Sequence, residues 1–461
     1  MTRYKLLAAC MALGLAASAS AEKIEFWTFS MKPKFTPYFE GIVKQYEASH
    51  PGVKIEWVDF PWDIIQTKLV TRIVAGTPPA LVNLNVPWAD EFARDGLLTP
   101  IDALLDGHRK QYLSSALQDL TFHGKTYGFP LYSNVAVIAY NTEIFKAAGI
   151  ERPPRTLDEQ LAYARQIAQR TGKAGLCPAL SKIDGLMMQQ GLPVLANGRA
   201  AFNTPAHVAL LAKLAETYKA GGLLKDALFA EDNFPAAIDA YKGGRLGMLL
   251  APPTAVRRIE TDARDIYAKT DVAPAPLGPT GIADGGWLIH FAVPARVDVR
   301  QLPAIGEFAR FLTNDANQLA FAKQASVYPA AAIAAQDPFF TRAAGTGAAE
   351  KAVPAGAVSM RHARTMYVAG VEDYDELRRV LVKAVEAGVT GRADIKAALD
   401  EAAAIWNRKL ARSQHAATSE MRGAGRAAPP LSPGAASRQI AGFGPRMWGI
   451  ARHRPAALEA P

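Results

Sequence analysis

The chain has 461 residues, of which 49% are hydrophobic and 21% are charged, so its composition is that of a large globular protein and excludes a disordered one. This length predicts two or three folding units. The formal net charge of +9 comes largely from the two ends, where Arg3 and Lys5 precede residue 22 and an arginine-rich segment follows residue 412. The body between them has no long basic run, so we expect no nucleic-acid partner.

The first residues have the features of an export signal. Arg3 and Lys5 precede an apolar run at 6–17, and Ala19-Ser20-Ala21 has the small-x-small pattern of a cleavage site. We therefore predict a signal peptide at 1–21 and a periplasmic mature protein. The alternatives are a membrane anchor, for which the apolar run is shorter than the ~20 residues that span a bilayer, and lipid attachment at Cys10.

Strands and helices alternate after this signal. Alternating or short apolar segments predict strands at 23–27, 53–58 and 80–84. Apolar residues at helical spacing predict helices at 35–46, 61–73 and 88–94. Three successive strand–helix units predict an α/β fold with a mainly parallel sheet covered by helices.

The later pattern continues with strands at 128–132, 135–140, 246–250 and 286–293, and helices at 142–148, 157–170, 205–220, 303–313, 374–387 and 392–409. The segment 272–282 is rich in Pro and Gly and is better suited to an interdomain crossing than to a helix or strand. Residues 413–461 are Ala, Pro, Gly and Arg in irregular order and predict a disordered tail. The alternative is an arginine-rich arm for an anionic partner.

Motifs for enzyme chemistry are weak. There is no Gly-x-x-x-x-Gly-Lys-Ser/Thr loop, no Gly-x-Ser-x-Gly turn and no His-Glu-x-x-His helix, and the histidines are scattered singly. Signal cleavage would leave Cys177 as the single cysteine, which excludes an intramolecular disulfide and a Cys-rich metal site. We therefore expect no cofactor, no metal and no catalytic residues. A carboxylate pair for glycoside hydrolysis stays open, because separations in space are not readable from sequence.

Aromatic and amide side chains gather at the predicted strand ends. In open α/β sheets, ligands bind beyond the carboxyl ends of the strands. Sugars present C–H faces that stack on aromatic rings and hydroxyls that bond to amides and carboxylates. Taken singly, each ring is more often part of a core, but their concentration favours a binding role for this group: Trp27, Phe29, Trp62, Asn83, Asn85, Trp88, Tyr132, Asn134, Gly286 and Trp287.

Several runs are similar to the sugar-binding family of extracellular solute-binding proteins from bacterial ABC importers, which includes maltose- and multiple-sugar-binding proteins. The runs are Ile24–Phe29, Phe39–Tyr46, the Glu-x-x-His-Pro-Gly-Val-Lys-Ile segment from Glu47, Leu69–Pro79, Leu81–Leu84, Tyr127–Pro130 and, above all, Tyr140–Ile150 with Pro153-Pro154-Arg155-Thr156; 308–321 and Tyr328-Pro329 complete them. The resemblance covers about residues 22–410.

This resemblance implies a two-lobed periplasmic-binding-protein fold with a hinge and a ligand cleft between the lobes. It places residues 22–132 and 273–326 in the N-terminal lobe and 133–272 and 327–412 in the C-terminal lobe, with crossings near 132–134, 272–281 and 326–329. Carried over position by position, it implies ligand contacts from Trp27, Asn83 or Asn85, Tyr132, Pro253-Thr254 and Gly286-Trp287, to which we add Tyr328 of the third crossing.

Two departures from the family pattern affect this site. Ala80 stands where relatives have aspartate, and Ala251-Pro252-Pro253-Thr254 replaces a usual Gly-Pro-Trp, which removes a stacking ring. The resemblance implies a monomer that binds a small carbohydrate and delivers it to ABC permease subunits in the inner membrane. The alternatives are a binding protein for a polyol, glycerophosphodiester or polyamine, and an exported glycoside hydrolase. We expect Trp27→Ala or Trp287→Ala to weaken solute binding without unfolding the protein.

Overall fold

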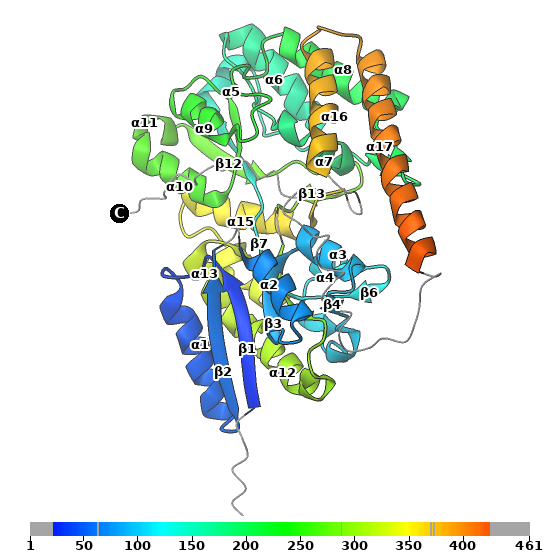
Figure 1. Ribbon diagram of the computed structural model, residues 1–461. Helices are drawn as coiled ribbons and strands as arrows, with labels where there is room; N and C mark the ends of the chain where they lie inside the picture. Colours follow the sequence, from blue (N-terminus) through cyan, green and yellow to red (C-terminus); the bar gives the residue numbers. More distant parts are fainter. Residues whose placement is uncertain (1–21, 62–63, 287, 369–370, 372–373, 425–461) are drawn as a thin grey trace, which may run out of the picture. The chain divides into compact units, whose positions relative to one another are not determined.

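The computed structural model describes residues 22–424, apart from 62–63, 287, 369–370 and 372–373. The described residues up to Asn407 form one compact unit, and the chain from Arg408 belongs to a second. Within the first unit, two main sheets each carry their own helices (Figure 1). The predicted signal peptide, Trp62, Trp287 and residues 425–461 lie outside the described residues.

The larger sheet has seven strands in the order β15-β7-β14-β3-β1-β2, with β4 beside β14. Its strands are β1 (Glu22–Phe29), β2 (Val53–Phe60), β3 (Leu81–Asn85), β4 (Leu98–Thr99), β7 (Phe129–Ser133), β14 (Ile289–Pro294) and β15 (Tyr328–Pro329). β1 is parallel to β2 and β3, as the first strand–helix units predict, whereas β14 is antiparallel to β3 and β7. The prediction of a mainly parallel sheet is therefore wrong for this half, because β7 and β14 belong to segments that connect with the second sheet.

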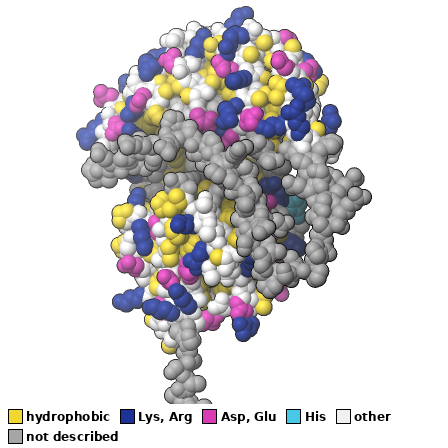
Figure 2. Space-filling view, in the orientation of Figure 1, with side chains coloured by type: hydrophobic (Ala, Val, Ile, Leu, Met, Phe, Trp, Pro, Cys, Tyr) yellow, Lys and Arg dark blue, Asp and Glu magenta, His cyan; other side chains and the backbone are white. Residues whose placement is uncertain are grey.

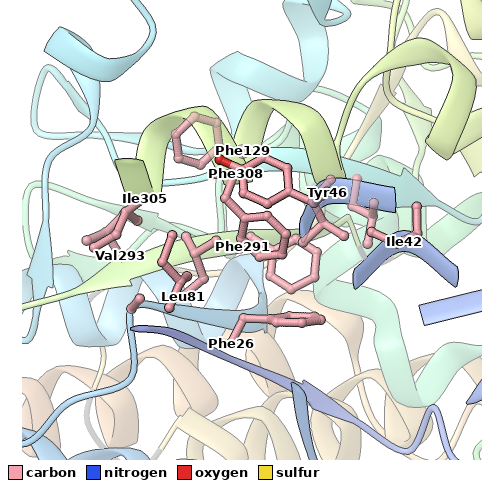
Figure 3. Packing of buried hydrophobic residues seen from close by; sticks show 14 of the residues in the cluster. Phe26, Ile42, Tyr46, Leu81, Phe129, Phe291, Val293, Ile305 and Phe308 are labelled. Carbon is pink, nitrogen blue, oxygen red and sulfur yellow. The ribbon is translucent and has the colours of Figure 1, made fainter. Parts of the chain in front are cut away.

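Helices cover both faces of the larger sheet. Side chains alternate between the faces, so Phe26 packs in one core cluster and its neighbour Trp27 in the other. The first cluster includes residues of α1 (Thr36–Ser49), α12 (Leu302–Leu312) and α13 (Asp315–Ala325), and Figure 3 shows Phe26, Phe291 and Phe308 within it. The second includes residues of α2 (Ile65–Val74), α3 (Val86–Arg94) and α4 (Ser114–Asp119). Each fully buried large side chain stabilises the fold by about 1.5–3 kcal/mol.

The smaller sheet has three antiparallel strands in the order β11-β8-β12: β8 (Val137–Asn141), β11 (Met248–Ala251) and β12 (Thr270–Pro274). A core cluster joins it to α9 (Phe234–Lys242), α10 (Pro253–Asp262) and α15 (Ala348–Met360). α5 (Thr142–Ala148) follows β8 and has the bounds that the sequence predicts. Asn141 caps its start by accepting from the amides of Glu143 and Ile144, and Gly149 ends it with a φ of 74°.

The remaining helices are α6 (Leu157–Thr171), α7 (Ile183–Gln189), α8 (Pro205–Lys219), α11 (Arg264–Tyr267), α14 (Pro338–Thr341), α16 (Tyr374–Val389) and α17 (Ile395–Ala424). The short strands are β5 (Thr121–Phe122), β6 (Lys125–Thr126), β9 (Leu195–Ala196), β10 (Arg199–Ala200), β13 (Ala283–Asp284) and β16 (Ala363–Arg364).

Three segments differ from the sequence-based expectations. β12 is a strand where a Pro-rich crossing was expected, which is possible because it is an edge strand and Pro274 is its last residue. β15 still pairs with β7, so the chain remains in the larger sheet at the position of the third predicted crossing. α17 continues to Ala424, past residue 413 where the predicted tail begins; the stretch 413–424 contains no proline and is rich in helix formers.

Candidate functional site

The carboxyl ends of β1, β2 and β3 lie at one edge of the larger sheet, because these strands are parallel. Phe29, the last residue of β1, is 5% exposed, and its ring lies 5.9 Å from the half-buried ring of Trp88 at an interplanar angle of 72°. Phe60 ends β2 and is also half-buried. The predicted pair Phe29 and Trp88 is therefore brought together here.

Trp27 is a core residue. Its side chain is 1% exposed, Nε1 donates to Glu25 Oε1 at 2.6 Å, and the ring packs edge-on against Phe60 with centroids 4.7 Å apart. The Arg72 guanidinium lies 5.5 Å from the ring centroid and pairs with Glu25. Both faces of β1 are covered by helices, so its side chains are buried whichever face they point to. The structure does not present the Trp27 ring to a solute.

The two predicted asparagines of β3 support the fold. Asn83 is fully buried and donates from Nδ2 to the His290 carbonyl at 3.0 Å across the β3–β14 pair. Asn85 is 1% exposed and caps α3, accepting from the Trp88 amide at 2.9 Å. Both side chains are therefore buried and bonded to the backbone rather than exposed to solvent.

The connection between β7 and β8 meets the segment after β13. The Ser133 hydroxyl donates to the Gly285 carbonyl at 2.6 Å. Gly286 has a φ of 57°, and a Cβ added there would lie 2.8 Å from the Asn134 carbonyl oxygen. Asn134 is exposed and Tyr132 is half-buried. Of the predicted residues, Asn134 and Gly286 therefore meet at this junction, whereas Tyr132 pairs with Ile289 of β14 and Pro329 of β15 and its ring lies 5.3 Å from that of Phe321.

A third segment joins the same junction. β13 pairs in parallel with β16, and the Gly285 amide donates to the Arg364 carbonyl at 2.9 Å. Arg364 in turn forms an ion pair with Asp119 of α4. Segments from three distant parts of the chain, 133–134, 283–286 and 363–365, are thus held together by hydrogen bonds. We call this the three-segment junction.

Of the other predicted residues, Tyr328 pairs in register with Ser133 of the junction, whereas Pro253 and Thr254 belong to α10. Pro253 is buried at the start of α10, with Thr254 exposed beside it. Tyr328 is 3% exposed, donates to the Val353 carbonyl at 2.9 Å, and lines a pocket of about 360 Å³ with Leu113, Phe340, Met360 and other residues.

Further titratable side chains, those of Asp90, Tyr367 and Asp284, lie near Asp119 or within the junction. Asp90 on α3 is 4% exposed and lies 3.5 Å from Arg94, yet desolvation raises its pKa. Desolvation also raises the pKa of Tyr367, and the negative charges of Asp90 and Asp119 raise it further. Asp284 is exposed, but protein around it desolvates the carboxylate and raises its pKa. The Asp284-Gly285-Gly286 run was the sequence signal for the last of these.

Within the described ranges, no group of three or more His, Cys, Asp or Glu side chains is placed to hold a metal ion. None of the described helices combines the length and the apolar character needed to cross a bilayer. On the face seen in Figure 2, Lys and Arg side chains are interspersed with Asp and Glu. Such mixed charge gives this face no single-sign field for steering a polyanion.

Comparison with known proteins gives matches along most of the chain. The profile of the family described as bacterial extracellular solute-binding protein matches residues 41–348. A Brucella abortus protein, provisionally named as a binding protein, is 30% identical over 287 residues, which cover 60% of this chain and 68% of that one. The diacetylchitobiose-binding protein DasA of Streptomyces coelicolor is 24% identical over 322 residues, 68% of this chain and 73% of its own.

Solved structures match the fold. A periplasmic-binding protein from Synechococcus sp. MITs9220, provisionally assigned to oligosaccharides, superposes with a TM-score of 0.70 and 30% identity over 85% of this chain and 99% of that chain. Maltose-bound MalE3 of T. maritima superposes with a TM-score of 0.60 and 22% identity over 84% of this chain and 99% of its own. The predicted two-lobed α/β periplasmic-binding-protein fold is confirmed by these superpositions.

Proposed function

Because the chain belongs to the family of bacterial extracellular solute-binding proteins, we propose that it captures a sugar or oligosaccharide by hinge closure of its two lobes and delivers it to an ABC importer. The chain is a solute-binding protein, and the similar proteins are binding proteins rather than enzymes. The single observation that carries the sugar assignment is the 30% identity to the Synechococcus protein over 99% of that protein's length. The proposal includes a periplasmic location, a monomeric state and the absence of catalysis.

The three-segment junction supports hinge closure. Three separate segments are joined there by hydrogen bonds of 2.6 Å (Ser133 Oγ to Gly285 O) and 2.9 Å (Gly285 N to Arg364 O). Hinges of a few residues that absorb backbone rotation are a common basis of domain closure. A solute that contacts both lobes only when they are closed stabilises that state by its differential binding free energy. A permease that recognises the closed state then makes transport depend on the solute.

The proposed binding residues are those near the strand ends and the junction that keep some exposure. Trp88 and Tyr132 are half-buried and Asn134 is exposed, so they are suited to stacking and to hydrogen bonding with hydroxyls. Trp62 and Trp287 stay in the proposal as predicted stacking rings outside the described residues. The burial of Trp27, Asn83 and Asn85 supports a structural role for these three instead.

A thermal-shift screen of the purified protein tests the function. The panel is maltotriose, diacetylchitobiose, mannitol, glycerophosphocholine and spermidine; the first four are solutes named for similar proteins. A solute that binds only the folded state stabilises it by about 2.7 kcal/mol at 100 times its Kd. We expect a rise in Tm with a saccharide. A rise with spermidine or glycerophosphocholine alone would contradict the sugar assignment.

Two further measurements separate the competing functions. Small-angle scattering with and without the bound saccharide should give a smaller radius of gyration in the bound state, since closure compacts the molecule. Overnight incubation with maltotriose should leave it intact. Release of glucose or maltose would favour the exported hydrolase.

A further inference from the structure

A pocket of about 360 Å³ lies beside β15, between the 3₁₀ turn Ala334–Gln336, α14 and the end of α15. Well-packed protein interiors have few voids larger than a water molecule. Here short side chains leave the volume open, since Ala335 of the turn and Ala357 of α15 both line it. The pocket therefore follows from the choice of small residues on two elements that face it.

Apolar side chains that are fixed by core packing form the walls of this pocket. Tyr328 is 3% exposed, its hydroxyl donates to the Val353 carbonyl at 2.9 Å, and its ring lies 5.8 Å from that of the buried Phe340. The same hydroxyl lies against Gly356, where an added Cβ would be 2.0 Å from it. Tyr328, Phe340 and Met360 belong to one core cluster. The walls are therefore already in place, as they are in most small-molecule sites.

The apolar character continues onto the surface around the pocket. Ile333 is 72% exposed, Phe339 is 43% exposed and Val358 is 47% exposed. Each of them is the sequence neighbour of a residue that lines the pocket. A single exposed apolar side chain needs no explanation, but several that gather around one opening mark an interaction site. This surface favours an occupant with an apolar body.

Arg361 is the charged side chain that lines the pocket. It follows the last residue of α15 and is exposed. Within the described part of the chain no carboxylate pairs with its guanidinium, whereas Arg364 pairs with Asp119. No Asp or Glu is among the described residues that line the pocket. The full charge of the guanidinium outweighs the partial negative charge at the end of the helix. A carboxylate can therefore bind here through two parallel hydrogen bonds.

We propose that this pocket is a second binding site, for a small amphipathic monocarboxylate whose apolar body lies among Tyr328, Phe340 and Met360 and whose carboxylate binds Arg361. Its volume is at the small end of the range of about 300–1,000 Å³ for ligand pockets. A phosphate group suits the site less well, because a dianion needs more donors than one guanidinium supplies. The described residues proposed for the saccharide do not line the pocket, so this inference goes beyond the proposed function and does not rest on it.

A ligand-observed NMR titration of the purified protein with 4-phenylbutyrate tests the site, and 4-phenyl-1-butanol is the neutral analogue with the same apolar body. We expect 4-phenylbutyrate to bind with a Kd of about 1 mM. The alcohol should bind about 10-fold more weakly, because it forms no charge-assisted pair. Arg361→Gln should weaken 4-phenylbutyrate binding by about 10-fold and leave the affinity for the alcohol unchanged. Arg170→Gln is the matched control, since Arg170 is exposed in the last turn of α6, and it should keep both affinities.

Ala335→Leu tests the pocket itself, because the larger side chain occupies the volume that alanine leaves open. Ala335 is half-buried, so we expect the variant to fold, and its Tm checks this. Both probes should lose affinity by about 10-fold or more. Ala162→Leu on α6 is the control, since Ala162 is exposed. The inference is overturned if the wild type does not bind 4-phenylbutyrate or binds the acid and the alcohol equally. Wild-type affinity for 4-phenylbutyrate in Arg361→Gln, or in folded Ala335→Leu, would also overturn it.

Discussion

Arg364 and Thr365 share the carboxylate of Asp119. The Arg364 guanidinium donates from Nε to Asp119 Oδ1, and the Thr365 amide donates to Oδ2 at 2.7 Å. Asp119 lies on α4 beside the larger sheet, and its side chain is 6% exposed. Arg364 belongs to β16, which pairs with β13. One buried carboxylate therefore fixes a segment of the three-segment junction to the helices of the larger sheet.

Arg364→Ala should destabilise the protein by about 3 kcal/mol, because it leaves a buried carboxylate with the Thr365 amide as its remaining strong donor. Urea denaturation followed by circular dichroism gives the free energy of unfolding. Arg258→Ala is the control: this arginine is 64% exposed and pairs with Asp262 on the same helix, so its loss should cost less than about 1 kcal/mol. Equal effects of the two substitutions would show that the Arg364 pair adds no more than a surface pair.

A comparison of Gly286→Ala with Gly281→Ala measures the steric effect of a side chain at the three-segment junction. Both glycines have positive φ, 57° and 76°, so both substitutions incur the left-handed penalty of about 1–2 kcal/mol. An added Cβ at Gly286 would lie 2.8 Å from the Asn134 carbonyl oxygen, whereas at Gly281 it meets nothing within 4 Å. We expect Gly286→Ala to lower the unfolding free energy further and to weaken saccharide binding measured by calorimetry. Identical stability and affinity in the two variants would mean that the Asn134 backbone moves away from the added Cβ at no measurable cost.

Local patterns were sufficient for most elements of the fold. The bounds of α5 follow from its cap residues Asn141 and Gly149, and the strands and helices from 22 to 94 follow from hydrophobic periodicity. The order of the strands in the larger sheet could not be predicted from the sequence in this way. The antiparallel entry of β14 between β3 and β7 depends on contacts between residues about 200 positions apart, such as Asn83 Nδ2 to His290 O. No local pattern encodes such a pairing.

The site was harder to predict because position at a strand end does not determine exposure. Trp27 and Trp88 both stand near the end of a predicted strand, but Trp27 lies inside a strand that continues to Phe29, while Trp88 lies in the first turn of α3. The amides of Asn83 and Asn85 have the chemistry that a sugar site needs, but in the structure they bond within the sheet and at the helix cap. Asp284 stands before two glycines, and this pattern is typical of a turn rather than of a binding site.

Trp27→Ala and Trp88→Ala should distinguish a core residue, whose loss lowers stability, from a binding residue, whose loss lowers saccharide affinity. The buried position of Trp27 changes the earlier expectation that its removal spares the fold: we now expect a loss of about 3–5 kcal/mol in unfolding free energy, typical of a buried Trp to Ala change. Trp88 is half-buried, so its removal should cost less stability and reduce saccharide affinity. Urea denaturation and calorimetry on both variants give the comparison. Saccharide affinity that survives Trp88→Ala unchanged would remove this ring from the site.

His290 is an uncharged residue in the core of the larger sheet. It is fully buried in β14, and within the described residues neither ring nitrogen makes a regular hydrogen bond. Its ring packs against Gly128, where an added Cβ would lie 2.2 Å from Cδ2. Burial lowers the pKa of His290 to about 3 from an ordinary value of 6.5, and the Leu288 backbone offsets only part of this effect. The imidazole therefore stays neutral in the folded protein at mildly acidic pH.

The unfolded chain binds a proton at this histidine between about pH 6.5 and pH 3, whereas the folded chain does not. Stability is therefore lost as the pH falls below about 6.5, and at about pH 4.5 the loss amounts to about 3 kcal/mol. Leucine has a volume similar to that of histidine and cannot be protonated. His290→Leu should therefore remove this part of the fall in unfolding free energy at acidic pH, while keeping or raising stability at neutral pH. Urea unfolding across this pH range measures the slope. The control His108→Leu removes an exposed imidazole and should follow the wild-type curve; a His290→Leu curve parallel to wild type would mean that the buried ring takes up its proton without unfolding.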